Sequence, residues 1–590
     1  MIFFPFFFSF NAIPINQEVS KIQDPFATNN NISKPKTSWQ IAWQNNGSVI
    51  CNYIDGQDYP HLISDDNGGA IIIWSDERTG GTQHDIYAQK IKSNGETLWG
   101  NGYELWGGEQ DRNGTIITDE TNTISEMYPV ICSDNAGGAI IAWMDNRGPY
   151  NNHEIYAQHI DSSGQCHWGE GGDLNGSTIC NATGQDDDFF VRICSDGTGG
   201  AFIVWQDDRD DSDIFDIYAQ HIDSTGQTHW GENGDLNGTV ICNQTSHQEL
   251  PQICRGGTNG AIIAWTDSRN NPPKGAGDIY AQYIDLNGQT YWGENGDLNG
   301  TVVCNATGDQ RFTAYSSYTF RNICSDNQEG AIITWIDQRT SAITQCDIYA
   351  QRIDSSGQTY WGGDNDLNGT VICNTTADEE FPVICSDNND GAIIAWEKGD
   401  VDHQNISAQL IDGNGQTQWD TNGIVISDTA NWEVQPQVCS DKRGGAYIVW
   451  NDNYDIYAQW VNSKGVSQWK ENGELICNAE ITDFMQEMPQ ICSDENGGVF
   501  MVWCDRRDNT ATEMDIYAQY ISNPLPSGGA PLVGGDDDDD DEGEGEDTGV
   551  FIIVVIIIVF ASVAGGLVVI YVLIQKGIID ISKLKTKLNR

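Results

Sequence analysis

The chain has 590 residues, and its 86 Asp and Glu outnumber its 29 Lys and Arg, which gives a formal net charge of −57. Nucleic-acid binding requires a basic surface that neutralises phosphates, so this composition excludes that class of function. Hydrophobic residues make up 38% of the chain and there are 20 Trp, which is far more core-forming material than an intrinsically disordered protein contains.

Residues 1–16 begin with the apolar stretch MIFFPFFFSF, which is typical of a signal peptide. No basic residue precedes that stretch, and Phe10 interrupts the small-residue pattern before Ala12, so an apolar N-terminal tail is the alternative. Residues 17–38 are expected to form a linker. The next region, residues 39–523, is the predicted folded domain.

Three phrases recur in fixed order within this domain. They are P-x-I-C-S-D-x-x-G-G-A-I-I-x-W-x-D-x-R, then D-I-Y-A-Q-x-I-D, then G-Q-x-x-W-x-x-N-G followed by V-I-C-N. Short apolar runs separated by Gly- and Ser-containing turns predict four strands per unit. The Trp of the first phrase marks eight units: Trp74, Trp143, Trp205, Trp265, Trp335, Trp396, Trp450 and Trp503. Eight four-stranded units predict an all-β fold, an eight-bladed β-propeller.

The ends of the repeat predict how the ring closes. The first unit begins with a third-phrase segment at Trp43, whereas the last unit stops at Ile521 without one. We therefore expect an N-terminal strand to complete the last blade. An open solenoid is the alternative, but it would need polar capping units, and neither end of the repeat has one.

The phrase G-G-A-I-I-A-W-x-D-x-R, at residues 137–147 and in shorter form at 260–269, together with D-I-Y-A-Q at 278–282, resembles a repeat of secreted and cell-surface proteins of bacteria and archaea. The resemblance covers roughly residues 40–521. It implies a β-propeller scaffold. Most members of that group have no assigned activity, so the resemblance implies little about function.

The C-terminal region predicts a membrane anchor. Residues 524–548 are Gly- and Pro-rich and then acidic, which is typical of an extended stalk. Residues 549–574 hold an uncharged apolar run long enough to cross about 30 Å of hydrocarbon as a transmembrane helix. The short tail 575–590 is basic, so the positive-inside rule predicts a single-pass protein of the cell membrane, with the N-terminal domain extracellular and the C-terminus cytoplasmic.

Six units place an Asp and an Arg two residues apart on one strand face, as in Asp207 and Arg209. A sialidase-like hydrolase would use several Arg to clamp a sugar carboxylate. Recurrence in six units favours a structural role, because a catalytic residue should be singular. With no nucleophile elbow, P-loop or isolated carboxylate pair in the sequence, we predict that the protein is not an enzyme. The Gln of each D-I-Y-A-Q phrase is expected to satisfy buried backbone groups.

Calcium is the predicted cofactor. Three loops match the first half of a D-x-[DN]-x-[DN]-G pattern, in which alternate side-chain oxygens surround a hard cation. The candidate ligands are Asn233, Asp235, Asn237, Asn295, Asp297, Asn299, Asp364, Asp366 and Asn368. No Glu follows at the twelfth position, and Asn237, Asn299 and Asn368 also begin N-G-T glycosylation sequons. A metal-free turn rich in Asn and Asp is therefore the alternative.

Sixteen Cys in a domain expected outside the cell indicate disulfides. Five units hold Cys in both the V-I-C-N and the I-C-S-D positions, and the candidate bridges are Cys180–Cys194, Cys242–Cys254, Cys304–Cys324, Cys373–Cys385 and Cys477–Cys492. The two positions co-occur no more often than chance predicts. Free thiols that serve as small core residues are therefore the alternative.

Binding is expected where the repeat breaks. Units six and seven lose the pattern together, and Lys398 stands where Asp is expected. Unit seven contains extra aromatics, and unit five carries an aromatic insertion. Aromatic side chains on loops of a rigid scaffold suit stacking on sugars or anchoring a protein partner. The candidate ligand-binding residues are Trp432, Trp460, Tyr454, Tyr315 and Tyr318. Sequence drift in an unselected blade is the alternative.

Together these features predict a membrane-anchored extracellular β-propeller that presents a binding or adhesion surface to an extracellular polysaccharide or a surface protein. The alternatives are a sialidase-like carbohydrate-active hydrolase and a structural coat component of the cell surface. Exposed aromatics on one face would favour binding. A singular cluster of carboxylates and Arg around the central channel would favour the enzyme, and lateral self-association would favour the coat.

Overall fold

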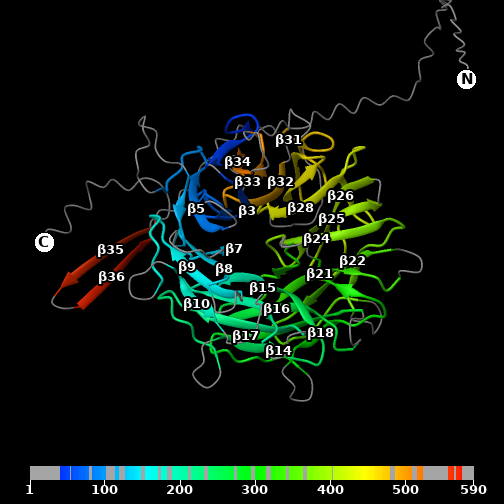
Figure 1. Cartoon of the computed structure of the whole chain (residues 1–590), viewed down its shortest axis with the longest axis horizontal. Coiled ribbons are helices and arrows are strands. Elements are labelled where there is room, and N and C mark those ends of the chain that lie inside the picture. Colours follow the sequence, from blue (N-terminus) through cyan, green and yellow to red (C-terminus); the bar gives the residue numbers. More distant parts are fainter. Residues whose placement is uncertain are drawn as a thin grey trace, which may run out of the picture. The chain divides into compact units, whose positions relative to one another are not determined.

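The structure is a computed structural model, and its described part consists of residues 40–522 with gaps and of two strands within residues 556–573 (Figure 1). The gaps are residues 54, 79–82, 101–112, 119–125, 148–152, 170–174, 182–188, 210–213, 232–236, 271–275, 294–298, 314–319, 341–344, 363–367, 401–402, 479–485 and 508–513. The chain divides into two compact units, residues 1–527 and 528–590.

The first unit consists of antiparallel sheets, which we number as blades one to eight in chain order. Blade one holds β3 (Gln57–Ser64), β4 (Gly69–Asp76), β5 (Asp85–Lys92) and β6 (Thr115–Ile116). Blade two holds β7 (Glu126–Ser133), β8 (Ala139–Asp145), β9 (Glu154–Ile160) and β10 (Ser177–Cys180). Blade three holds β11 (Phe189–Ser195), β12 (Ala201–Asp207), β13 (Asp216–Ile222) and β14 (Thr239–Cys242). Blade four holds β15 (Gln248–Arg255), β16 (Gly260–Asp267), β17 (Asp278–Asp285) and β18 (Thr301–Cys304).

The next three blades repeat the pattern. Blade five holds β19 (Gln310–Arg311), β20 (Ile323–Ser325), β21 (Ala331–Asp337), β22 (Asp347–Ile353) and β23 (Thr370–Cys373). Blade six holds β24 (Asp378–Ser386), β25 (Ala392–Asp400), β26 (His403–Ile411) and β27 (Ile424–Ser427). Blade seven holds β28 (Glu433–Ser440), β29 (Ala446–Asp452), β30 (Asp455–Val461) and β31 (Glu474–Cys477).

Blade eight joins the two ends of the domain. It holds β32 (Gln486–Ser493), β33 (Val499–Asp505) and β34 (Asp515–Ser522) from the end of the repeat, with β1 (Gln40–Ile41) and β2 (Ser48–Cys51) from its beginning. Strand β2 pairs with β34 through Ser48↔Ala518 and Val49↔Tyr517. The prediction of an eight-bladed all-β propeller closed by an N-terminal strand is therefore confirmed.

The first strand of each blade lines the inside of the ring. Each of these strands contacts the first strand of the next blade, from β3 through β7, β11, β15, β20, β24, β28 and β32 and back to β3. Strand connections alternate between two faces. The S-D-x-x-G-G and S-S-G-Q turns lie on one face, which we call the turn face. The loops after W-x-D-x-R and after V-I-C-N lie on the other, which we call the loop face.

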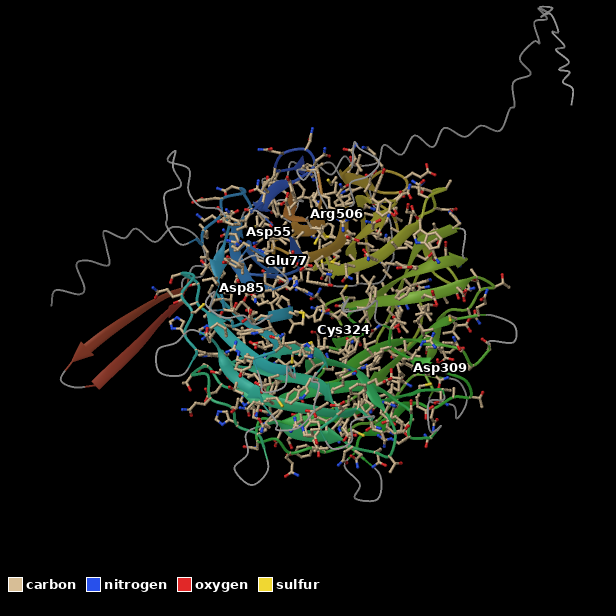
Figure 2. The ribbon with its side chains drawn as sticks, in the orientation of Figure 1. Asp55, Glu77, Asp85, Asp309, Cys324 and Arg506 are labelled. Atoms are coloured by element: carbon tan, nitrogen blue, oxygen red, sulfur yellow. The ribbon has the colours of Figure 1, made fainter. Side chains whose placement is uncertain are left out.

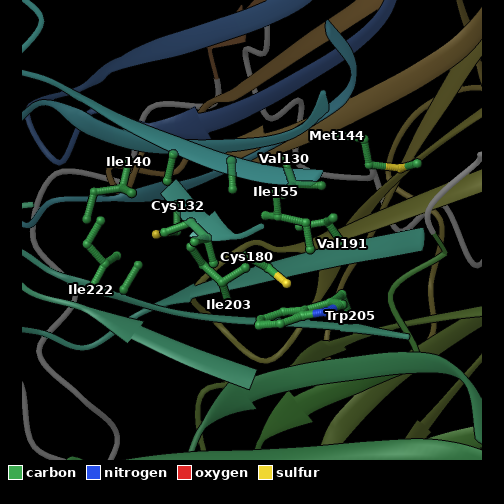
Figure 3. Packing of buried hydrophobic residues seen from close by; sticks show 14 of the residues in the cluster. Val130, Cys132, Ile140, Met144, Ile155, Cys180, Val191, Ile203, Trp205 and Ile222 are labelled. Atoms are coloured by element: carbon green, nitrogen blue, oxygen red, sulfur yellow. The ribbon is translucent and has the colours of Figure 1, made fainter. Parts of the chain in front are cut away.

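The second strand of each blade is buried on both sides, as its continuous apolar run predicts. All eight residues of β16 are buried, for example. The hydrophobic core lies between adjacent blades, where one cluster joins Val130, Cys132 and Ile155 of blade two to Ile203 and Trp205 of blade three (Figure 3). Each blade therefore depends on both neighbours for its burial.

Two repeated glycines explain why the phrases recur so strictly. Gly238 has φ +86, and a Cβ there would lie 2.5 Å from Cη2 of Trp205. Gly226 has φ +83, and a Cβ there would lie 2.6 Å from Cδ1 of Trp168, which belongs to the preceding blade. A left-handed backbone and close approach of an indole ring both require glycine. Gly238 therefore fixes a Trp of its own blade, and Gly226 fixes a Trp of the preceding blade.

The predicted buried role of the D-I-Y-A-Q glutamine is confirmed. Gln220 donates from Nε2 to the carbonyl of Trp230 at 2.9 Å and accepts the N–H of the same residue at 2.8 Å. It thereby ties the third strand to the third-phrase Trp. Equivalent bonds occur in the other blades, for example between Gln89 and Trp99.

The second unit differs from the helix predicted over residues 549–574. Within that range the structure has two antiparallel strands, β35 (Ile556–Val563) and β36 (Gly566–Leu573). The segment is rich in Ile and Val, whose branched side chains favour strands as well as lipid-facing helices. Among the described residues, no helix is long and apolar enough to span a membrane. The rest of the predicted helix, the stalk, the tail and residues 1–39 lie outside the described residues.

Candidate functional site

The W-x-D-x-R phrase forms a repeated polar node on the loop face. In blade three, Trp205 Nε1 donates to Asp207 Oδ2 at 2.9 Å, and Arg209 Nε donates to the same oxygen at 2.8 Å. Arg209 also reaches Cys180 Sγ at 3.0 Å, on the outer strand of blade two. Its guanidinium lies over the ring of Tyr218, 3.9 Å from the centroid. The node therefore links two blades.

The same ion pair forms in each unit that keeps both residues: Asp76–Arg78, Asp145–Arg147, Asp207–Arg209, Asp267–Arg269, Asp337–Arg339 and Asp505–Arg507. In every case the arginine lies over the Tyr of its own D-I-Y-A-Q or equivalent phrase. The structural role predicted for these pairs is therefore confirmed.

The five predicted disulfides are not formed, because all sixteen Cys are free thiols in the structure. Each V-I-C-N cysteine lies on the outer strand of one blade, as Cys180 does on β10, whereas each I-C-S-D cysteine lies on the inner strand of the next, as Cys194 does on β11. The two positions are therefore at opposite radial ends of neighbouring blades. A disulfide needs the two Cα atoms to lie within about 7 Å of each other. Cys residues that are close in sequence do not meet this condition when they lie at opposite radial ends of neighbouring blades.

Blade six breaks the node but compensates for the change. Lys398 stands in the Asp position, and Glu379 stands at the start of the inner strand, where four of the eight blades have Gln and the other three have an acid. The two residues are in register, and Lys398 Nζ lies 3.9 Å from Glu379 Oε1. The Glu379 carboxyl is fully buried. The ion pair is therefore kept with its polarity reversed, which argues against unselected drift in this blade.

Blade seven breaks the node without restoring a cation. Tyr454 stands in the Arg position, and the in-register pair beside it is Glu433 and Asp452. Ser427 and Thr429 donate their hydroxyls to Glu433 Oε1, the latter at 3.0 Å. Burial raises the pKa of both carboxyl groups, and the charge of Asp452 raises that of Glu433 further. Both carboxyl groups contact the Thr429 hydroxyl, and each is harder to ionise than an exposed acid.

Close to this carboxyl pair in sequence, blade seven exposes two aromatic side chains. Trp432 is 41% exposed and Tyr454 is 46% exposed. Their loops touch, because the N–H of Asn453 donates to the Trp432 carbonyl at 3.1 Å. Two residues join β29 to β30, whereas eight lie between β12 and β13. The short turn therefore leaves this pair, which we call the blade-seven aromatic pair, open to solvent on the loop face.

The turn that carries Tyr454 is strained. Asn453 has φ 54 and Tyr454 has φ 78. Both values suit a type I′ hairpin turn, in which Asn is favoured at the first position and Gly at the second. A bulky residue with positive φ costs about 1–3 kcal/mol, and such strain tends to persist at functional sites. Positive φ also occurs at bulge residues of the inner strands such as Tyr59 and Phe381, so it is the exposure of the Tyr454 ring that makes it a candidate binding feature.

The other candidate binding residues are placed differently. Trp460 is 5% exposed, stacks on Tyr447 and donates from Nε1 to Asp441 Oδ2 at 2.9 Å. It is a core residue, because its position in the D-I-Y-A-Q phrase points between blades. Tyr315 and Tyr318 lie outside the described residues.

The candidate calcium ligands are described in part. Asn237, Asn299 and Asn368 each accept through Oδ1 the backbone N–H of a residue in the preceding blade, at 2.9, 3.2 and 2.9 Å. A cation would compete with these inter-blade bonds for the same oxygens. The remaining candidates, Asn233, Asp235, Asn295, Asp297, Asp364 and Asp366, lie outside the described residues. Calcium binding stays a prediction.

On the turn face, the Asp of S-D-x-x-G-G meets a variable donor. Asp134 Oδ2 lies 2.9 Å from His159 Nε2, and the equivalent partners in other blades are Lys90, His221, Arg352, Trp460 and Tyr520. A pocket of about 420 Å³ lies beside Asp134 and His159, between blades two and three. Turn hydrogen bonds together with His159 lower the pKa of Asp134. This pair holds the turn, and the pocket beside it is lined by polar side chains together with Ala136 and two glycines.

Four basic residues on or next to the innermost strands were not predicted as a feature of the fold. His61, Arg192 and Arg255 lie on these strands and Arg321 lies two residues before β20, each at a position where the other blades have a different residue. Arg321, for example, stands where six of eight units have Pro. Such single departures from a repeat position were visible in the sequence. Their position on or beside the strands that line the ring was not.

Comparison with known proteins assigns this chain to no family. No family model matches the chain, and no curated protein does. Similar solved structures include an ulvan lyase of a polysaccharide lyase family, 11% identical over 82% of this chain and 96% of that chain, with a TM-score of 0.36. An α-L-arabinofuranosidase of Fusarium graminearum is 10% identical over 56% of this chain and 92% of its own, with a TM-score of 0.29. Prolyl oligopeptidase B from Galerina marginata is 10% identical over 78% of this chain and 56% of its own, with a TM-score of 0.37. At these values the similarities carry no conclusion about activity or substrate.

Proposed function

We propose that this protein binds carbohydrate at the blade-seven aromatic pair and presents this site outside the cell. The observation that carries the proposal is the exposure of Trp432 and Tyr454 on the loop face of a rigid ring, on two loops that a backbone hydrogen bond joins. Aromatic rings gain free energy by covering apolar surface, and a sugar ring offers an apolar face of similar size. Loops on a rigid scaffold are the usual position for binding residues.

Polar groups around the aromatic pair suit the hydroxyls of a sugar. Gln404 pairs with Trp432 as an isolated bridge, and the ring of His403 contacts the carbonyl of Thr429. The His403 side chain is 39% exposed. Donors and acceptors at the edge of an aromatic platform fix the orientation of a ligand, whereas the platform supplies contact area. This combination favours a sugar over a wholly apolar ligand.

Burial of the neighbouring acids favours binding over hydrolysis. A glycoside hydrolase needs two carboxyl groups that flank the scissile bond. Glu433 is 0% exposed and Asp452 is 3% exposed, so neither carboxyl group is open to a ligand on the surface. Neither can reach a glycosidic oxygen of a sugar stacked above. The protein therefore serves as a binding protein in this proposal, and a protein ligand anchored by the same rings is the second outcome of its test.

The cell-surface position is part of the same proposal. The apolar run at residues 549–574 anchors the chain, and the acidic run before it extends the propeller away from the membrane. Inside a bilayer an open pair of strands would leave backbone groups at its edges without partners, so a spanning form of this segment is helical. Protease treatment of intact cells should remove the propeller and leave a short membrane-bound fragment.

The proposal is tested by binding the full chain to a panel of polysaccharides, with calcium and again with a chelator. We expect retention of one sugar class, and loss of that retention in Trp432→Ala and Tyr454→Ala. Tyr360→Ala is the matched control, because Tyr360 is 55% exposed on the turn face. Equal losses in all three variants, or no retention of any polysaccharide, would contradict carbohydrate binding at this site. A chelator effect would show whether calcium is required.

Tyr454→Gly separates binding from folding. Glycine tolerates φ 78 without strain, so this variant should be more stable than the native protein by about 1 kcal/mol while it binds less tightly. If Tyr454 has no part in binding, the variant gains the same stability and keeps the affinity of the native protein.

A further inference from the structure

Glycosylation sequons of the form N-x-[ST] recur at two positions of the repeat. One kind, N-G-[ST], stands directly before the outer strand of a blade, and the other, C-N-x-T, stands at its end. The first kind begins at Asn46, Asn113, Asn175, Asn237, Asn299 and Asn368, and the second at Asn181, Asn243, Asn305 and Asn374. An N-linked glycan is bulky and hydrophilic, so the asparagine that carries it must face solvent.

Solvent exposure separates the two kinds of sequon. All four asparagines of the C-N-x-T kind are exposed, whereas all six of the N-G-[ST] kind are half-buried, as is Asn405 in a separate sequon. In three C-N-x-T sequons the threonine is described, and it is exposed each time: Thr245, Thr307 and Thr376. The residue between the two is half-buried in these three sequons. The amide and the hydroxyl that define a sequon are therefore open to solvent together.

The N-G-[ST] asparagines belong to the joints between blades. Asn237, for example, accepts the backbone N–H of Asn181 through Oδ1 at 2.9 Å, and its own carbonyl accepts a bond from Arg209 at 3.1 Å. The same pair of contacts recurs in the next two blades through Asn299 and Asn368. A glycan on such an amide would have to fit between two packed blades.

The C-N-x-T asparagines are held by their backbone, which leaves the side chain open. Asn374 donates its backbone N–H to Asn422 Oδ1 of the next blade at 3.2 Å, as Asn181 does to Asn237. The next residue, Thr375, donates its hydroxyl to the buried Glu379 and so faces the protein. Among the described residues, none forms a hydrogen bond with the side-chain amide of a C-N-x-T asparagine. These four amides are therefore accessible acceptors in a fixed position.

The exposed sequons occupy one half of the ring. They follow the outer strands of blades two, three, four and five, whereas the segments after the outer strands of blades six, seven, eight and one contain no sequon. Figure 2 shows Asp309, four residues after Asn305, toward the rim of the ring, with Cys324 near its centre. These segments lie on the loop face, which also carries the blade-seven aromatic pair. Blade seven thus lies in the half of the loop face without exposed sequons.

We propose that the four C-N-x-T asparagines carry N-linked glycans, which cover the loop-face rim of blades two to five and leave blade seven open to its ligand. The donor is an oligosaccharide linked to a lipid through a diphosphate. A bond forms between the asparagine Nδ2 and C1 of the sugar, the bond between C1 and the diphosphate oxygen breaks, and Nδ2 loses one proton as the lipid diphosphate leaves. The modification rests on the proposed function for export of the chain, but not for carbohydrate binding.

The test maps glycan occupancy on the full chain, captured by surface biotinylation from the cells that make it, by protease digestion and mass spectrometry. We expect glycopeptides at Asn181, Asn243, Asn305 and Asn374. The peptides with Asn237, Asn299 and Asn368 should be unmodified. Unmodified asparagine at the four exposed sequons, or equal occupancy of the exposed and the half-buried sequons, would overturn the proposal.

Two substitutions of one threonine separate the modification from folding. Thr307→Ala removes the sequon of Asn305 and should lower the mass of the chain by one glycan, whereas Thr307→Ser keeps the sequon and the glycan. Thr301→Ala is the matched control in the same blade, because it removes the half-buried sequon of Asn299 and should not change the glycan content. A full glycan complement in Thr307→Ala would contradict the assignment of Asn305.

Polysaccharide binding is measured separately on the same material. Glycans at the four sites without retention of any polysaccharide would support the modification and contradict the proposed function, and retention by a chain without glycans would do the reverse. A variant that combines Thr183→Ala, Thr245→Ala, Thr307→Ala and Thr376→Ala should bind the retained polysaccharide with native affinity. A tenfold gain in its affinity would show that the glycans cover blade seven, against the second part of the proposal.

Discussion

Glu397 offers a direct test of the electrostatics of the ring, because its carboxyl group is buried away from any cation. It lies on β25, is 3% exposed, and accepts the N–H of Gln435 through Oε1 at 2.8 Å. Burial, with a smaller contribution from Glu380, raises its pKa to about 8. The folded state therefore favours the protonated form. Stability from this group is complete below the unfolded pKa of about 4.3 and is lost as the pH rises through 8.

The Glu397→Gln variant removes the cost of ionisation and keeps an acceptor oxygen for Gln435. A rise in pKa from about 4.3 to about 8 corresponds to at most about 5 kcal/mol at full ionisation. Local relaxation lowers that figure, so we expect a gain of about 2 kcal/mol or more at pH 9 and almost none at pH 4. Urea unfolding at both pH values measures the difference. A gain that is equal at the two pH values, or a loss at pH 9, would refute the reasoning.

Three further predictions concern the scaffold. Gly238→Ala should lower the free energy of unfolding by about 2–4 kcal/mol in urea denaturation, because it combines a positive φ with a contact to Trp205. Lys398→Asp should lower the free energy of unfolding by about 2 kcal/mol or more, measured by thermal unfolding, because it places a second acid beside Glu379. Adding Glu379→Gln to this variant should recover most of the lost free energy. Thiol labelling at pH 8 should be at least tenfold slower in the native state than in urea, because burial raises the pKa of thiols such as Cys132. After unfolding without reductant, all sixteen Cys thiols should react with the label. Each disulfide that forms would lower the number of labelled thiols by two.

Much of the fold was predictable because each strand position recurs in many blades. The Trp, the Gly and the Gln of the three phrases meet one another in every blade, so their repetition alone pointed to a structural role. Ring closure followed from the missing third phrase after Ile521, and β2 supplies the expected strand. Strict repetition is therefore reliable evidence for scaffold residues.

The arrangement between blades was not predictable. Sequence spacing placed Cys180 close to Cys194, but the chain crosses from the rim to the channel between them. The four basic residues on or beside the inner strands were hidden for a related reason. A β-bulge interrupts the inner strand of blade one between Asp58 and His61, with φ 51 at Tyr59, and it changes which side chains face inward. A strict two-residue alternation does not identify those positions.

The candidate site was predicted in part. Trp432 and Tyr454 were identified because they depart from the repeat, and both are exposed. Trp460 departs from the repeat as well, yet it fills the same space as the Tyr520 of blade eight and donates to the equivalent Asp. A departure from the repeat therefore marks function only where the position faces solvent.

The most direct test of carbohydrate binding at blade seven is the affinity of Tyr454→Gly and Trp432→Ala for the polysaccharide retained by the native chain, measured by titration calorimetry together with their melting temperatures. We expect both variants to bind at least tenfold more weakly, which corresponds to about 1.4 kcal/mol, while Tyr454→Gly melts at a higher temperature and Tyr360→Ala binds like the native protein. Native affinity in Tyr454→Gly and Trp432→Ala would contradict the account.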